Sequence, residues 1–288
     1  MPVTTVPTRV GRLVVHDEGP ATQQPVVQRR AAQPRPAQPR PAPVLVFRHG
    51  IFFDHRLWAR QAAHFSRSQR VLSIDSPGHG SSGDPGRAYS LDDDAQATLE
   101  VMDALGISRA VLVGHSWGGM SALRTALSSS DRVEALALVD TPLLGPTRSG
   151  RVRFRTLRAV VELAGTPRWF AERIAADMFT RRGRAERPEL DENLIRSLSG
   201  LDRRAVARAM QAVLIDPGDM VERMSQLTVP VLVAAGAEDY VLPPAVAERV
   251  RRALPASTIS VVPGGHVIPL ESADATTDLL SDFVESLR

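Results

Sequence analysis

Short apolar runs alternate along the first half of the chain with longer stretches in which apolar residues recur at helical spacing. Helical patterns near 55–66 and 91–105, and a third directly after Ser116, separate the apolar runs. Val- and Leu-rich runs that alternate with helices are typical of parallel strands covered on both faces. The pattern therefore predicts an α/β fold with a doubly wound, mostly parallel sheet. The strands of this half are expected at 44–49, 70–75, 110–114 and 133–140.

The pattern changes in the second half of the chain, where arginine-rich helical periodicity replaces the alternation of strands and helices. Strands return at 228–237 and 257–265, and a last helix begins at about residue 270. A helical insert that interrupts one α/β core explains this order. We expect a core formed by residues 1–145 and 227–288 and a helical cap formed by residues 146–226.

Residues 20–43 are rich in Pro, Gln, Arg and Ala, and the sequence QPRPA occurs there twice, at 33–37 and 38–42. Such a composition favours extended polyproline-like conformations and cannot bury a core. We interpret the segment as a flexible insertion within the first part of the core. An alternative is a regulatory module that uses this segment to engage proline-recognition partners.

Composition narrows the classes of function. The 288 residues include 35 cations, all of them arginine, scattered among 32 acidic residues for a net charge of +3. A nucleic-acid binder would concentrate its arginines on one face, so no nucleic-acid partner is expected. The absence of cysteine excludes disulfides, a thiol nucleophile and thiolate metal ligands. Because the chain shows neither a signal-peptide pattern nor a membrane-spanning apolar run, we expect a cytoplasmic protein without a membrane partner; its oligomeric state stays open.

Ser116 carries the candidate chemistry. It lies in VLVGHSWGG (111–119), between glycines, where an apolar strand gives way to a helix. An alcohol attacks only with a base beside it and hydrogen-bond donors for the developing oxyanion. The glycines permit a sharp strand-to-helix turn that presents the serine above the edge of the sheet. Ser116 is therefore the predicted nucleophile.

Two further residues follow later strands in the order that such a fold requires. Asp239 comes after the strand that ends near 237, and His266 comes after the last strand. Since both positions lie at the carboxyl ends of strands, the side chains should meet Ser116 at the same edge of the sheet. We assign His266 as the base and Asp239 as its orienting acid. Asp140, which follows another strand, is the rival acid.

The oxyanion donors are expected in the main chain. His49-Gly50 ends a strand, and its glycine lets the chain turn so that the N–H of Ile51 faces Ser116. The N–H of Trp117, at the start of the following helix, is the second donor. His49, His79 and His115 are expected to hold loops by hydrogen bonds rather than to transfer protons, and His55 is expected to start a helix.

Five motifs in matching order make the chain resemble the α/β-hydrolase fold family: HG (49–50), DSPGHGSSG (75–83), GHSWGG (114–119), GAEDYVLP (236–243) and GGHVIPLE (264–271). The resemblance covers most of residues 44–288 except the helical insert, which in this family is a variable cap. It implies Ser116 as nucleophile, His266 as base, Asp239 as its partner, and no cofactor or metal.

The Ser-Trp pair makes the chain resemble haloalkane dehalogenases and epoxide hydrolases, which place an aspartate at the position of Ser116. Attack by a serine on an alkyl carbon would leave a stable ether, whereas attack on a carbonyl leaves an ester that the same histidine can hydrolyse. We therefore expect a serine esterase acting on a small ester-type substrate. A lactonase or carbon–carbon bond hydrolase with the same triad, and a hydrolase-like ligand receptor with little turnover, stay open.

Specificity should come from apolar side chains over Ser116, because small-molecule sites are mainly apolar. The arginine-rich run 181–187 is interpreted as a solvated helix end rather than as a site for an anionic substrate. The candidate substrate-binding residues are Phe52, Phe53 and Trp117 from the core and Trp169, Phe170, Met178, Phe179 and Met210 from the cap.

Overall fold

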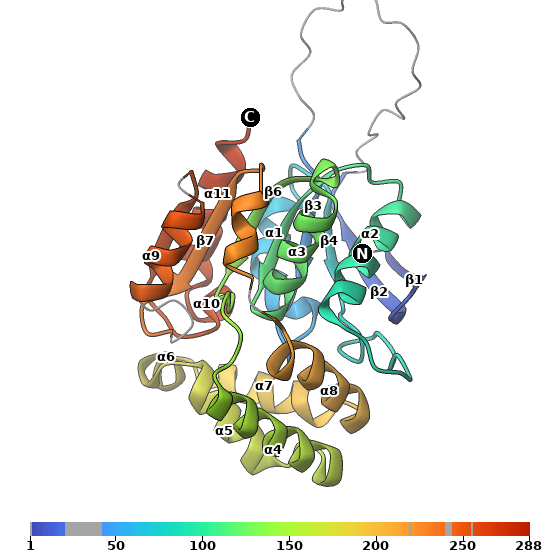
Figure 1. The fold of residues 1–288 in the computed structure, drawn as a ribbon, viewed down its shortest axis with the longest axis vertical. Helices are drawn as coiled ribbons and strands as arrows, with labels where there is room; N and C mark the ends of the chain where they lie inside the picture. Colours follow the sequence, from blue (N-terminus) through green and yellow to red (C-terminus); the bar gives the residue numbers. More distant parts are fainter. Residues whose placement is uncertain (1, 21–41, 219, 240–243, 255) are drawn as a thin grey trace, which may run out of the picture.

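The computed structural model has one eight-stranded sheet with helices on both faces (Figure 1). It describes residues 2–20, 42–218, 220–239, 244–254 and 256–288. The strand order is β1-β2-β4-β3-β5-β6-β7-β8. The pairs β1–β2 and β2–β4 are antiparallel, and all other neighbouring strands are parallel. The predicted fold class is confirmed.

The central strands are buried on both faces because their residues are nearly all apolar. Every residue of β3, β4, β5 and β7 is buried. All six predicted strands are present, within a few residues of the expected limits. The eight strands span Val3–Thr8 (β1), Gly11–Glu18 (β2), Leu45–Arg48 (β3), Val71–Ile74 (β4), Ala110–His115 (β5), Val133–Val139 (β6), Val231–Gly236 (β7) and Thr258–Val262 (β8).

The N-terminal hairpin of β1 and β2 was missing from the sequence prediction. Its signal is present in the two runs of Val and Thr that flank Gly11, which adopts a φ of +100° at the turn. β2 then pairs with β4 and extends the sheet beyond the parallel strands. Half of β1 stays exposed, so the strong apolar run that marks a central strand is absent there.

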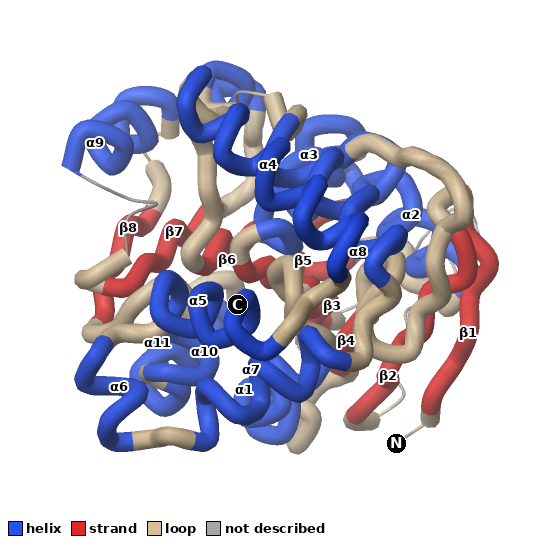
Figure 2. The backbone as a smooth tube through the Cα atoms, turned by 90° about the horizontal axis from the view of Figure 1, so that it is seen from below, coloured by secondary structure: helices blue, strands red, loops and turns tan. Residues whose placement is uncertain are grey.

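Helices cover both faces of the sheet, with α2, α3 and α9 on one face and α1 and α11 on the other (Figure 2). The predicted start of α2 is confirmed: the Ser90 hydroxyl accepts the N–H of Asp93, whose carboxylate accepts the N–H of Ser90. These elements are η1 (His55–Trp58), α1 (Ala59–Phe65), α2 (Leu91–Ala104), α3 (Trp117–Ser128), η2 (Ser130–Arg132), α9 (Pro244–Ala253), α10 (Ile268–Glu271) and α11 (Ala273–Glu285).

The helices α4 to α8, which follow β6, lie together at one end of the sheet (Figure 1), whereas the short turn η4 that precedes β7 packs against α3 and α9 of the core. The apolar sides of α4 to α8 face one another and the loops of the core; Phe170, Leu198 and Val206 are buried there. The elements are α4 (Arg148–Ala164), α5 (Arg168–Met178), α6 (Arg181–Glu186), α7 (Glu189–Ser199), α8 (Arg203–Met210), the π-helical turn η3 (Gln211–Ile215) and η4 (Glu222–Gln226).

Most of the predicted flexible insertion, residues 21–41, lies outside the described residues. The same holds for residues 240–243 of the motif that contains Asp239. Among the helices that the structure describes, none has the length and apolar character needed to cross a bilayer.

Candidate active site

Ser116 occupies the sharp turn between β5 and α3. Its backbone lies at φ +49° and ψ −112°, a left-handed conformation that a residue with a Cβ rarely adopts. The N–H of Ser116 donates to the carbonyl oxygen of Val139 on β6 at 2.9 Å, which holds the turn against the sheet. The buried side chain of Ser116 reaches the wall of a cavity. Such a strained turn persists only where its surroundings enforce it, and it is typical of functional sites.

Glycines at two positions let the chain pack closely enough to form this turn. A Cβ at Gly118 would overlap the backbone of Arg48 at the end of β3. A Cβ at Gly50 would overlap the His115 ring and press on the Cβ of Ser116. Glycine is therefore needed at both positions because β3, β5 and α3 pack too closely here to leave room for a Cβ.

His266 joins Ser116 to Asp239. Its Nε2 lies 3.1 Å from the Ser116 Oγ, and its Nδ1 lies 3.1 and 3.0 Å from the two carboxylate oxygens of Asp239. Burial alone would lower the pKa of His266, but the hydrogen bond and the charge of Asp239 outweigh it and raise this pKa above the usual 6.5. The loops after β5, β7 and β8 thus bring together the three residues that the sequence analysis selected.

Asp140, the rival acid, has different partners. Its two carboxylate oxygens accept the N–H groups of Gly236 and Ile268, each at 3.0 Å. Burial raises the pKa of Asp140. Its carboxyl holds the main chain at the end of β7 and after His266, whereas both carboxylate oxygens of Asp239 face the Nδ1 of His266, which favours Asp239 as the acid that orients this ring.

Two of the histidines that were expected to hold loops, His49 and His115, make hydrogen bonds to the main chain. His49 donates from Nδ1 to the carbonyl oxygen of Gly50 and accepts the N–H of Ser76 at Nε2, both at 2.8 Å. His115 donates from Nε2 to the carbonyl oxygen of His266 at 2.7 Å. Burial lowers the pKa of His49 to about 4 and that of His115 to about 3, so both rings are neutral near pH 7.

The turn after β3 and the start of α3 each supply one of the predicted oxyanion donors, the N–H groups of Ile51 and Trp117. Phe53 donates to the carbonyl oxygen of Gly50 at 3.2 Å, and Phe52 has a φ of +73°, the geometry of a type II turn. In such a turn the N–H of Ile51, the second residue, takes no part in the closing hydrogen bond. Trp117 is the first residue of α3, so its N–H has no acceptor within the helix. Ile51 and Trp117 line the same cavity as Ser116.

The cavity above Ser116 has a volume of about 300 Å³, at the lower end of the range for small-molecule sites. Its wall combines the core loops with α4, α5 and η3 and is mainly apolar. Residues that the sequence analysis did not select include Met120, Leu144, Phe154, Leu157, Val213 and Leu214, together with the charged Arg153 and Asp177.

Of the predicted substrate-binding residues, Phe52, Trp117 and Met178 line this cavity. Phe53, Phe170, Phe179 and Met210 are buried in packing between elements and are absent from its wall. Trp169 is 60% exposed and also lies outside the cavity. On amphipathic helices an aromatic residue signals a buried face, but the sequence does not tell whether that face meets a neighbouring helix or a ligand.

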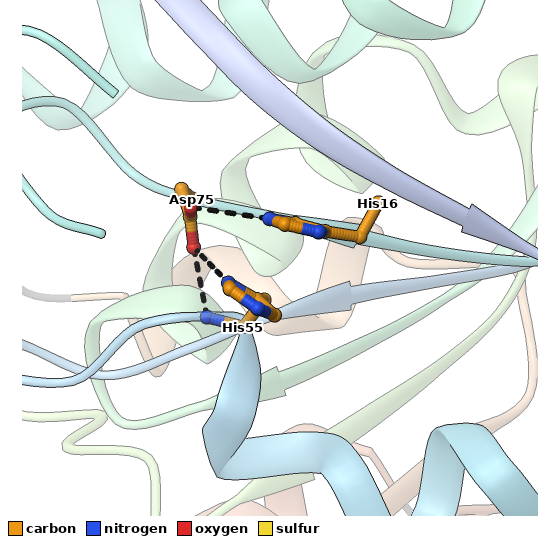
Figure 3. A group of neighbouring side chains, drawn as sticks. All are labelled: His16, His55 and Asp75. Carbon is orange, nitrogen blue, oxygen red and sulfur yellow. Dashed lines mark hydrogen bonds and ion pairs between the residues drawn. The ribbon is translucent and has the colours of Figure 1, made fainter. Parts of the chain in front are cut away.

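A second group of polar side chains joins the hairpin to the core (Figure 3). The rings of His16 and His55 are stacked with centroids 3.4 Å apart, and both nitrogens approach the buried Asp75, at 3.4 and 2.9 Å. The carboxylate also accepts the N–H groups of His55 and Ser81. Lone pairs of two stacked, nearly parallel rings do not converge on one metal position, so this group fits a hydrogen-bonded bridge better than a metal site. His55 starts η1, as predicted.

The chain is similar to known proteins in both sequence and fold. Residues 43–273 match the family model described as alpha/beta hydrolase fold. The chain is 24% identical over 252 residues to 3-oxoadipate enol-lactonase 1 of Acinetobacter baylyi, covering 86% of this chain and 90% of that protein. It is 30% identical over 253 residues to a putative carbamate hydrolase RutD of Klebsiella pneumoniae, covering 85% and 92%. A thermophilic esterase from Thermogutta terrifontis has the same fold, with a TM-score of 0.85, 22% identity, and coverage of 100% and 99%.

Proposed function

The chain belongs to the α/β-hydrolase fold family and is a hydrolase, and we propose that it is a serine hydrolase that cleaves a carboxylic ester or related acyl bond through an acyl-enzyme. The observation that carries this proposal is the hydrogen bond of 3.1 Å between the Ser116 Oγ and the His266 Nε2. His266 is in turn held through Nδ1 by Asp239. A serine, a neutral imidazole and a carboxylate in this order form the arrangement that activates an alcohol.

The proposed reaction begins with attack of Ser116 on a carbonyl carbon while His266 takes the hydroxyl proton. The N–H groups of Ile51 and Trp117 donate to the oxyanion of the tetrahedral intermediate. His266 then returns the proton to the leaving alcohol as the carbon–oxygen bond breaks, and Asp239 stabilises the imidazolium. A water molecule, activated by the same histidine, hydrolyses the acyl-enzyme and regenerates Ser116.

A lactone is a specific second candidate for the substrate. The curated relative from Acinetobacter baylyi is named an enol-lactonase, and a cavity of about 300 Å³ suits a small ring. Ring opening uses the same steps, except that the leaving alcohol stays attached to the acyl group. A carbon–carbon bond hydrolase would use the same three side chains, whereas a ligand receptor on this scaffold would bind an ester without turnover.

Hydrolysis of p-nitrophenyl butyrate tests the proposal. We expect the wild-type protein to release p-nitrophenol, and we expect Ser116→Ala to lose essentially all of this activity because no other group takes its place as nucleophile. Ser128→Ala, which removes a hydroxyl from the last turn of the same helix, is the matched control and should keep its activity. A phosphonate ester should label Ser116, as read by mass spectrometry. Undiminished turnover by Ser116→Ala would reject the assignment.

A further inference from the structure

Two charged side chains from the helical segment interrupt the apolar wall of the cavity. Besides His266, the charged or ionisable residues that line it are Arg153 of α4 and Asp177 of α5. They face each other, since the Arg153 Nη2 lies 3.3 Å from the Asp177 Oδ2. The Arg153 side chain is 68% exposed and that of Asp177 is 32% exposed, so this pair lies at the solvent-facing rim of the cavity, where a ligand entering it can reach the guanidinium.

Asp177 has a second partner on its own helix. The Arg173 Nη2 lies 2.9 Å from the Asp177 Oδ1, so each oxygen of this carboxylate faces a different guanidinium. Arg173 is absent from the cavity wall. If Arg153 turned toward a ligand, Asp177 would therefore keep one ion pair. The three side chains together carry one net positive charge, which an anion at the cavity would neutralise.

The surroundings of Arg153 favour an anion as well. Helix α4 contains five arginines and a single acidic residue, Glu162. Residues 146–226 contain sixteen arginines and eleven acidic residues, a formal charge of +5 in a chain whose total is +3. Arg158 is paired with Glu162, and Arg151 donates to the carbonyl oxygen of Ile215. A positive field around a cleft raises the local concentration of anionic ligands.

We propose that Arg153 binds a carboxylate on the substrate, so that the preferred substrates are small esters or lactones with an apolar body and one anionic end. This inference rests on the proposed hydrolase activity, because it describes the substrate of the same cavity. Arg153 forms no part of the bond-breaking chemistry and determines specificity: its guanidinium pairs with the carboxylate while Ser116 attacks the distant acyl carbon.

Three p-nitrophenyl esters of matched length test the proposal: the half-ester of adipic acid, the neutral hexanoate, and an ester whose acyl chain ends in trimethylammonium. Each kcat/KM is measured after subtraction of hydrolysis without protein. We expect the wild-type protein to prefer the adipate half-ester and this preference to shrink with added salt. In Arg153→Gln the ratio of kcat/KM for the half-ester to that for the hexanoate should fall by about tenfold.

Arg173→Gln is the matched control. Its side chain is 67% exposed against 68% for Arg153 and pairs with the same carboxylate, but it does not line the cavity. The ratio should change by less than about twofold in this variant, because exposed charges away from the ligand contribute little. An equal fall in Arg173→Gln, an unchanged ratio in Arg153→Gln, or a preference for the cationic ester would overturn the proposal.

Calorimetry with the adipate half-ester separates this proposal from the hydrolase assignment. Ser116→Ala should bind the intact half-ester, and Ser116→Ala combined with Arg153→Gln should bind it about tenfold more weakly. If the wild-type protein hydrolyses none of the esters but this difference in binding is present, the proposed function fails and the anion site stands. Equal binding by the two variants overturns the anion site, whatever the turnover.

Discussion

The main-chain N–H of His266 donates a hydrogen bond to the carbonyl oxygen of Met178 at 2.8 Å, which ties the loop after β8 to the end of α5. A second tie lies next to it: the buried Glu271 carboxylate accepts the N–H of Gly265 at 3.0 Å and both the N–H and the hydroxyl of Thr180. The loop that carries the proposed base is thus fixed by Met178 and Thr180, which belong to the helical segment between β6 and β7. The position of the imidazole therefore depends on how that segment sits on the core.

Glu271→Gln tests this dependence. An amide offers one acceptor oxygen in place of two. Depending on how the amide is oriented, either the N–H of Gly265 or the hydroxyl of Thr180 then faces an NH₂ group instead of an acceptor. Displacement of His266 by a fraction of an ångström should lower kcat by about 10- to 100-fold while KM changes much less. Glu285→Gln, at the exposed end of α11, is the control and should match the wild-type protein. An unchanged kcat in Glu271→Gln would show that the loop is held without this bridge.

The pH dependence of kcat/KM should follow the imidazole of His266. The proposed mechanism needs its neutral form, and Asp239 raises its pKa above 6.5, so activity should fall as the pH drops through this raised value. In Asp239→Asn the charge is lost and burial dominates, which lowers the pKa and moves the acidic limb to lower pH. The maximal rate should also fall, by about 10³-fold or more, because the imidazolium loses its stabilising charge. An acidic limb at the same pH in both proteins would contradict the assignment.

The sequence predicted the parts of the site that depend on local geometry. Glycines around a serine at the end of an apolar strand define the turn at Ser116 without knowledge of distant residues, and chain order then selects Asp239 and His266. Main-chain hydrogen bonds such as that between His266 and Met178 do not depend on the type of side chain, so the sequence does not predict them. The role of Glu271 depends on two segments that meet only in the folded protein, about ninety residues apart along the chain.

Charged residues inside the fold are harder to predict, since the same residue types usually face solvent. Arg48 is the last residue of the otherwise apolar strand β3 and is fully buried, with Asp94 of α2 as its partner. Arg153, whose side chain is 68% exposed at the rim of the cavity, follows the general arginine-rich pattern of its segment, so nothing in the sequence separates it from the other arginines there. Both assignments require the tertiary structure, which supplies the partner or the cavity.

Gly118→Ala should disturb the turn at Ser116 even though alanine is a small residue. Its Cβ would overlap the backbone of Arg48, which cannot move aside like a flexible side chain, so the start of α3 must shift. We expect a loss of stability of about 1–3 kcal/mol, measured by urea unfolding, and a larger relative loss of esterase activity. Gly200→Ala is the control, because a Cβ there meets only ordinary contacts, the nearest at 3.8 Å. Full activity of Gly118→Ala would contradict the steric explanation.

The buried pair of Arg48 and Asp94 gives a prediction about stability alone. The Arg48 Nη2 lies 2.6 Å from the Asp94 Oδ1, and both side chains are completely buried. Arg48→Met would leave an uncompensated buried carboxylate, so we expect the free energy of unfolding to fall by about 3–5 kcal/mol in urea titrations. Arg60→Met, which breaks an exposed pair with Asp274, should change it by no more than about 0.5 kcal/mol.

A double variant distinguishes the energy of the interaction between Arg48 and Asp94 from the effect of losing the arginine side chain alone. Arg48→Met combined with Asp94→Leu removes both charges and replaces them by apolar side chains, so it should be more stable than Arg48→Met alone. The difference measures the cost of leaving Asp94 unpaired. If the double variant is less stable than the single one by the full effect of Asp94→Leu in the wild-type background, the two residues do not interact, and the short contact between β3 and α2 contributes nothing to the fold.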